Sequence, residues 1–154
     1  MKLHSKFGVK ALFILGATFL FSFSTKKGGD SFEIWINGKK AIQQFVHVSK
    51  GVQTLHFTAV SENDKVDVYY SHCGQTGKDR YLTVKDEKNR PLKVWKFGDS
   101  NGNNTAMSLK LKDITRLKKQ KSDKLGLFYS SQQLPDGRLL AMIDSGNDSG
   151  IASR

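Results

Sequence analysis

The sequence predicts an all-β fold, an antiparallel β-sandwich of about eight or nine short strands with a jelly-roll or immunoglobulin-like plan. Apolar and polar residues alternate with a period of two through most of the chain, and turn-forming residues separate the alternating segments. Only residues 113–121 have a helical spacing, with Asp113 as the expected N-cap. A short helix of this kind can cross between two sheets, which favours the sandwich over the alternative, a β-barrel.

The first half of the chain contains the clearest alternation. Phe32, Ile34 and Ile36 share one face of a predicted strand, and Asn37-Gly38 follows it. Both residues of that pair tolerate a positive φ, which favours a two-residue hairpin turn. The other strands predicted in this half are residues 41–48, 54–60, 65–71 and 80–86.

The second half continues the pattern. Pro91 suits the first residue of a strand over 91–97. Trp95 and Phe97 share one face of it, opposite Leu92 and Val94, so we expect this strand to be buried on both sides. The remaining predicted strands are residues 107–112, 125–131 and 139–143, and turn chemistry at 134–137 joins the last two.

The N-terminus predicts export. Three lysines precede an uncharged, mostly apolar run at residues 11–23, and Ser22 and Ser24 supply small residues for cleavage after residue 24. The run is shorter than the roughly 20 residues of a membrane span, and no cysteine follows it to accept a lipid. An uncleaved N-terminal anchor is the alternative. We therefore expect a signal peptide at 1–24, one periplasmic or extracellular domain at 25–143 without a membrane span, and a flexible tail at 144–154.

Composition predicts a basic domain. The chain has 25 Lys and Arg against 14 Asp and Glu, and three of the lysines lie in the expected signal, which leaves 22 against 14, or +8. Such a surface attracts anionic partners, here an acidic polysaccharide, a glycolipid or another exported protein. Nucleic acid is not favoured, because the charge is scattered and also serves solubility. The one dense basic group is Arg116, Lys118, Lys119, Lys121 and Lys124.

His72-Cys73 is the first candidate for chemistry. Cys73 is the single cysteine, so no intramolecular disulfide can form. A cysteine beside a histidine suggests a nucleophile with its base, but adjacent strand residues point to opposite faces. A free cysteine is also usually a buried apolar residue, which is the expectation for Cys73. The spacing of His47, His56, His72 and Cys73 matches no metal motif, and no loop has the spacing of a nucleotide or calcium motif, so we expect no metal or cofactor.

Two groups of residues are candidates for ligand binding. Trp35, Tyr69 and Tyr81 fall on the outward faces of their strands, where aromatic rings stack on sugars or instead pack across strands. The second group lies in the loop 72–80, where Lys78 and Arg80 are candidate anion contacts and His72 a pH-sensitive neighbour. An ordinary connecting loop is the alternative for that segment.

The runs Tyr69–Gly74 (YYSHCG), Lys85–Lys88 (KDEK) and Trp95–Phe97 (WKF) resemble segments of small exported bacterial β proteins of unknown function. The resemblance implies a bacterial, periplasmic or secreted protein, and it transfers no activity and no catalytic residue. The sequence therefore favours a non-enzymatic binding or accessory module for an anionic or glycan partner. The alternatives are a Cys/His-dependent enzyme or metal-binding redox protein, and a structural or interaction subunit that uses an unpaired sheet edge.

Overall fold

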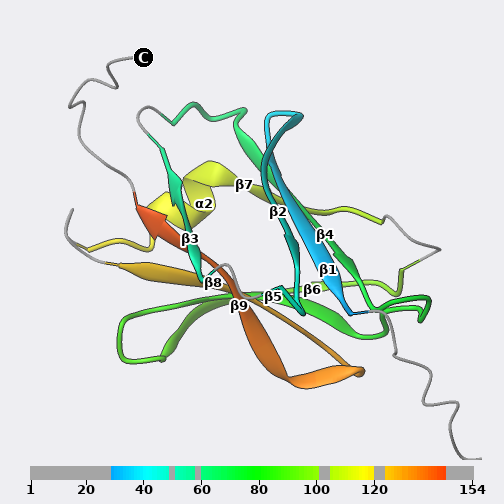
Figure 1. Ribbon diagram of the computed structural model, residues 1–154. Coiled ribbons are helices and arrows are strands. Elements are labelled where there is room, and N and C mark those ends of the chain that lie inside the picture. Colours follow the sequence, from blue (N-terminus) through cyan, green and yellow to red (C-terminus); the bar gives the residue numbers. More distant parts are fainter. Residues whose placement is uncertain (1–28, 49–50, 58–59, 101–104, 120–123, 145–154) are drawn as a thin grey trace, which may run out of the picture.

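In the computed structural model, the chain folds into two β-sheets that face each other (Figure 1). The structure describes residues 29–48, 51–57, 60–100, 105–119 and 124–144. The expected signal peptide and nearly all of the expected tail lie outside these residues. Within the described ranges, no helix has the length and apolar character needed to span a membrane.

Sheet A has four strands and sheet B has five. The strands of sheet A are β1 (Ser31–Ile36), β2 (Lys39–Phe45), β4 (Lys65–Ser71) and β7 (Met107–Lys110), in the spatial order β2-β1-β4-β7. The strands of sheet B are β3 (Gln53–His56), β5 (Arg80–Lys85), β6 (Pro91–Phe97), β8 (Leu125–Ser131) and β9 (Leu134–Asp144), in the order β3-β9-β8-β5-β6. Because the two sheets are separate and not closed on each other, the sandwich prediction is confirmed and the barrel alternative is not.

The core lies between the sheets and follows the period-two pattern of the sequence. Ile34 of β1 and Val68 of β4 are opposite each other in sheet A, and both are fully buried. In sheet B, Val84 of β5 pairs with Leu127 of β8, and these side chains are buried as well. Alternate residues of each strand therefore meet in one apolar layer, and the intervening residues form two outer faces.

The predicted hairpin at Asn37-Gly38 is confirmed. Asn37 has φ 50° and Gly38 has φ 77°, and β1 and β2 pair antiparallel on either side of them. The return strand occupies Lys39–Phe45, earlier than the expected 41–48, because the two-residue turn lets pairing start at once.

One pairing differs from the all-antiparallel expectation. β3 lies parallel to β9 at the edge of sheet B, with Gln53 opposite Ala141 and His56 opposite Asp144. All other strand pairs among the described residues are antiparallel. Asp144, expected to begin the tail, is therefore the last residue of a paired strand.

The helix is confirmed as a crossover but is shorter than expected and begins earlier. α2 (Leu111–Thr115) connects β7 of sheet A to β8 of sheet B. Its N-cap is Lys110, and Asp113 lies in the first turn, so the N-cap prediction was wrong. Leu111 and Ile114 are buried, and their packing places the helix start.

The expectation that β6 is buried on both sides was also wrong. Trp95 and Phe97 pack against the core, but Val94 is 52% exposed and Leu92 is 36% exposed. The reason is position: β6 is the edge strand of sheet B, and no third layer covers its outer face in the described part of the chain.

The connection between β8 and β9 is a turn at Gln132 and Gln133, not at 134–137. The backbone N–H of Gln132 donates to the carbonyl of Lys78 (2.9 Å), and the Gln133 side chain accepts from the N–H of Lys78 (2.9 Å). These contacts with a distant segment fix the turn. Gly137, with φ 71°, takes up an irregularity within β9 instead.

Candidate functional site

The outer face of sheet A brings together two of the three aromatic residues that the sequence singles out. Trp35 of β1 and Tyr69 of β4 are half-buried, and their ring centroids are 6.2 Å apart in an edge-to-face arrangement. Phe45 of β2 shares this face, opposite Ser31, and is 50% exposed. We call the surface formed by Trp35, Tyr69, Phe45, Glu33, Lys40 and Gln43 the sheet A platform.

Polar side chains fix the indole of Trp35 on the platform. Its N–H donates to a Glu33 oxygen (2.8 Å), and the other Glu33 oxygen accepts from the Lys40 ammonium (2.8 Å). Lys40 also donates to Gln43 (3.0 Å) and lies 5.2 Å from the centre of the Trp35 ring. The hydrogen bond from Lys40 holds the pKa of Glu33 below its ordinary value, so this carboxylate stays ionised and paired.

Tyr81 lies elsewhere. It alternates with the buried Leu82 on β5, so it belongs to the outer face of sheet B, on the opposite side of the sandwich from Trp35. There the Lys96 ammonium lies 5.6 Å from its ring centre, and the hydrogen bond with Tyr81 raises the pKa of Lys96. The structure therefore divides the three predicted aromatic contacts between two faces.

The chain turns sharply after β4, and this turn separates His72 from Cys73. Cys73 has φ 47° and Gly74 has φ 84°, and the N–H of Gln75 donates back to the carbonyl of His72 (3.2 Å). His72 points inward and is 6% exposed, whereas Cys73 is exposed at the tip of the turn. The expectation of a buried Cys73 was wrong, because a tight turn at the surface leaves its side chain no interior to enter.

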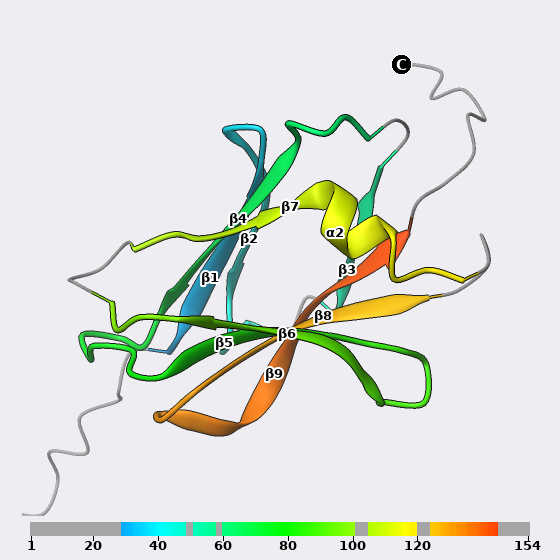
Figure 2. The same cartoon turned by 180° about the vertical axis from the view of Figure 1, so that it is seen from behind.

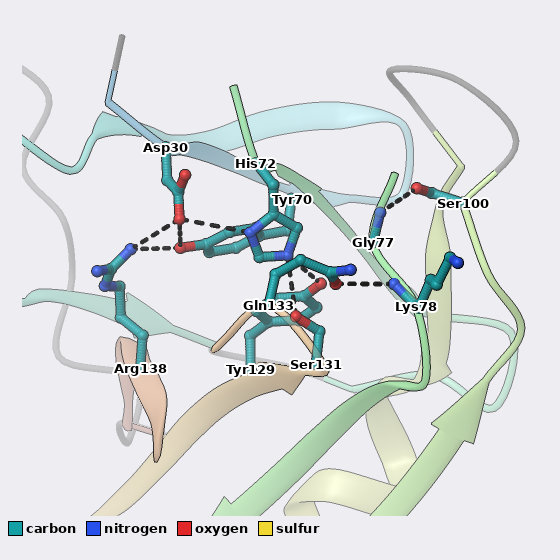
Figure 3. Close-up of polar contacts among 10 residues, drawn as sticks. All are labelled: Asp30, Tyr70, His72, Gly77, Lys78, Ser100, Tyr129, Ser131, Gln133 and Arg138. Atoms are coloured by element: carbon teal, nitrogen blue, oxygen red, sulfur yellow. Dashed lines mark hydrogen bonds and ion pairs between the residues drawn. The ribbon is translucent and has the colours of Figure 1, made fainter. Parts of the chain in front are cut away.

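His72 is the centre of a polar cluster between the sheets, drawn in Figure 3. Its Nε2 lies 2.9 Å from the Tyr129 hydroxyl and 3.0 Å from the Ser131 hydroxyl, and its Nδ1 lies 3.5 Å from an Asp30 oxygen. The members of this His72 network are Asp30, Tyr70 and His72 from the sheet A side and Tyr129, Ser131 and Arg138 from sheet B.

Hydrogen bonds and an ion pair also connect Asp30, Tyr70 and Arg138 within the network. The Tyr70 hydroxyl donates to Asp30 (2.9 Å), Arg138 donates to the Tyr70 oxygen, and the Arg138 guanidinium lies 3.6 Å from Asp30. Burial raises the pKa of both Tyr70 and Tyr129, so their hydroxyls remain protonated donors. Burial lowers the pKa of His72, which favours the neutral imidazole.

The order Ser131–His72–Asp30 is that of a serine-hydrolase triad, but the site is closed. Ser131 is 5% exposed, and Gly77 packs so tightly that a Cβ there would come 3.2 Å from the Tyr129 hydroxyl. The Ser131 hydroxyl and the His72 ring are therefore largely screened from solvent. The network is suited to holding the two sheets together.

Arg80 and Lys78, which the sequence analysis grouped as anion contacts, lie in different environments. Arg80 is 2% exposed, and its guanidinium donates to the carbonyls of Gly98 (2.7 Å) and Thr105 (2.8 Å). Burial lowers its pKa. Lys78 is exposed, and Figure 3 shows its side chain pointing away from His72. Joint anion binding by Lys78, Arg80 and His72 stays a prediction, and the geometry favours a structural role for Arg80.

The remaining histidines do not join His72. His47 is exposed just after β2. His56 lies in β3, the edge strand of sheet B, with its Nδ1 3.6 Å from an Asp144 oxygen. Among the described residues, no three His, Cys, Asp or Glu side chains converge as metal ligands do.

The sequence reasoning missed several residues of the platform, namely Glu33, Lys40, Gln43 and Phe45. The signal was available for three of them: period two places Glu33 outward between Phe32 and Ile34, and it places Gln43 and Phe45 outward once Ile42 is taken as buried. Lys40 comes beside Trp35 through a register shift between Ile34 and Trp35, which no pattern in the sequence announces.

No protein-family model matches the chain, and no curated protein has a significantly similar sequence.

Proposed function

We propose that the protein is an exported, non-enzymatic binding module whose sheet A platform binds an acidic polysaccharide. The observation that carries the proposal is the pair Trp35 and Tyr69, two neighbouring half-buried rings on an outer sheet face. Rings in this position offer flat apolar surface for the C–H face of a sugar, as aromatic side chains do for other flat ligand rings.

The polar surroundings of the rings support a carbohydrate ligand. Glu33, Lys40 and Gln43 hold hydrogen-bonding groups beside the Trp35 ring, in a network that keeps the ring oriented before a ligand arrives. Sugar hydroxyls need such donors and acceptors. The net positive charge expected for the mature chain favours polysaccharides that carry carboxylate or sulfate groups.

The test is retention of the purified protein on immobilised heparin and polygalacturonate, measured against salt. We expect salt-sensitive retention, weakened about tenfold by Trp35→Ala and by Tyr69→Ala, since one stacked ring contributes on this order. Tyr81→Ala is the matched control, because it removes an aromatic ring of similar exposure from the opposite face.

Absence of retention on either polymer at low salt would refute the proposal. Equal loss of retention in the Tyr81→Ala control would also refute it, since binding would then depend on the other sheet. Urea denaturation of each variant separates loss of binding from loss of folding.

A further inference from the structure

A groove of about 300 Å³ opens at the end of the sandwich that is remote from the turn after β4. Figure 2 shows the β5–β6 turn and the start of β8 at this end, with α2 nearby. The walls of the groove are the turn residues 86–90, the stretch after α2 and the start of β8. None of these residues belongs to the sheet A platform.

The floor of the groove is apolar. It is formed by Leu92 of β6, Leu117 after α2 and Leu125 of β8. Leu125 is buried in the core, Leu117 is packed against the core, and Leu92 is 36% exposed. The apolar lining therefore includes both core and solvent-exposed side chains, and a hydrocarbon chain laid on it would remove apolar surface from water.

The rim of the groove is predominantly positive. Four cationic side chains line it, which are Lys88, Arg90, Lys119 and Lys124, against the two carboxylates Asp86 and Glu87. Two of these residues, Lys119 and Lys124, belong to the basic stretch that stands out in the sequence, whose Lys121 lies outside the described residues.

The two carboxylates are already engaged. Asp86 accepts from the Arg90 guanidinium at 2.6 and 2.7 Å and from the backbone N–H groups of Lys88 and Arg90, and these bonds hold the pKa of Asp86 below its ordinary value. Glu87 accepts from the backbone N–H of Lys124 at 3.3 Å. Asp86 and Arg90 neutralise each other, so Glu87 is the remaining carboxylate on the rim beside Lys88 and Lys124.

We infer that this groove binds a small amphiphilic anion, a single phosphate or carboxylate group on a short hydrocarbon chain. The chain lies on Leu92, Leu117 and Leu125, and the head group meets the ammonium groups of Lys88 and Lys124. The volume is at the lower limit of small-molecule sites, which suits a short chain. Among the described residues that line the groove none is aromatic, so they offer no stacking surface of the kind that a sugar would use.

The test is calorimetric or NMR titration of the purified protein with octyl phosphate. Inorganic phosphate and octanol supply the charge and the hydrocarbon separately. We expect saturable binding of octyl phosphate with an affinity at least about tenfold higher than that of either fragment. Only the complete ligand contacts the apolar floor and the basic rim at the same time. Binding of either fragment as tight as octyl phosphate would overturn the inference.

Two variants localise the site. The double change Lys88→Gln with Lys124→Gln removes charge from the rim, and Leu92→Ser removes an exposed part of the floor. Each is expected to weaken octyl phosphate binding about tenfold. The matched control is Lys39→Gln with Lys110→Gln, which removes the same charge from exposed lysines that line neither the groove nor the loop 72–80. Equal weakening in the control, or no weakening in the groove variants, would overturn the assignment.

A flotation assay identifies the source of the ligand. Flotation with phosphatidylglycerol vesicles that is lost in the Lys88/Lys124 variant assigns the head group to membrane lipid. Soluble binding without flotation assigns it to a free molecule. The sheet A platform is unchanged in these variants. Retention on polysaccharide therefore tests the proposed function separately from the groove.

Discussion

His72 and Tyr129 meet across the two sheets, with 2.9 Å between His72 Nε2 and the Tyr129 hydroxyl, although 57 residues separate them in the sequence. The contact joins the end of β4 in sheet A to β8 in sheet B. Stacking of Tyr70 on Tyr129, with ring centroids 4.1 Å apart, reinforces it. Polar and aromatic contacts therefore connect the layers at a point where the apolar core ends.

The cost of breaking this connection depends on which partner is removed. Tyr129→Phe deletes one hydroxyl and leaves Ser131 on Nε2, so we expect a loss of about 1 kcal/mol in the free energy of unfolding. His72→Leu leaves Asp30, Tyr129 and Ser131 without the imidazole, and we expect a loss of roughly 2–4 kcal/mol. Urea denaturation measures both. Similar losses for the two variants would contradict the central position of His72.

Stability is expected to fall as the pH drops below about 6.5, the ordinary pKa of histidine. Burial lowers the pKa of His72, so the unfolded chain binds a proton before the folded protein does. The stabilisation is complete above the unfolded pKa and is lost as the pH falls towards the folded pKa. Asp30 attracts a proton to His72, while the Arg138 charge and burial oppose it.

Urea midpoints at pH 8 and pH 5 measure this dependence. His72→Gln is expected to flatten it, because an amide does not titrate in this range. His56→Gln is the control, since His56 is exposed beside Asp144. An unchanged pH dependence in His72→Gln would show that another group is responsible.

Arg80 and Lys78 are expected to differ sharply in their contribution to stability. Arg80→Ala leaves the carbonyls of Gly98 and Thr105 without their guanidinium donor, and we expect a loss of about 2–4 kcal/mol. Lys78→Ala is expected to change stability by less than about 0.5 kcal/mol, because the side chain is exposed and its backbone bonds remain. Equal effects would mean that the Arg80 contacts contribute nothing.

Cys73 is expected to react with iodoacetamide in the native protein. Its side chain is exposed at the tip of the turn after β4, and no partner cysteine exists in the chain. We expect the native labelling rate to lie within about threefold of the rate in urea, because access rather than unfolding controls it. Mass spectrometry follows the reaction, with Cys73→Ser as the blank. Labelling only in urea would contradict the exposed position.

Local patterns predicted most of this fold, because each strand carries its own alternation. Phe32, Ile34, Val66 and Val68 are buried as the period-two reading requires, and Asn37-Gly38 forms the expected hairpin turn. Such features depend on residues that are adjacent in the sequence.

Features set by distant segments were not predictable in the same way. The Gln132–Gln133 turn has no turn-forming composition and is fixed by the backbone of Lys78. The candidate site was predicted in part: Trp35 and Tyr69 were identified as outward rings, but their adjacency depends on the pairing of β1 with β4. Period two also cannot distinguish the two outer faces, and so Tyr81 was grouped with them.

The parallel pairing of β3 with β9 sets an order of events during folding. β3 is an early segment, but its hydrogen-bonding partner β9 is the last strand of the part of the chain that the structure describes. β1, β2 and β4 can pair among themselves beforehand, whereas the edge of sheet B waits for residues 141–144. Closing so long a loop is slow, because the chain loses conformational entropy before the two strands gain any contact. The edge of sheet B is thus expected to form late in folding, because its two strands are the most distant in sequence of all the described pairs.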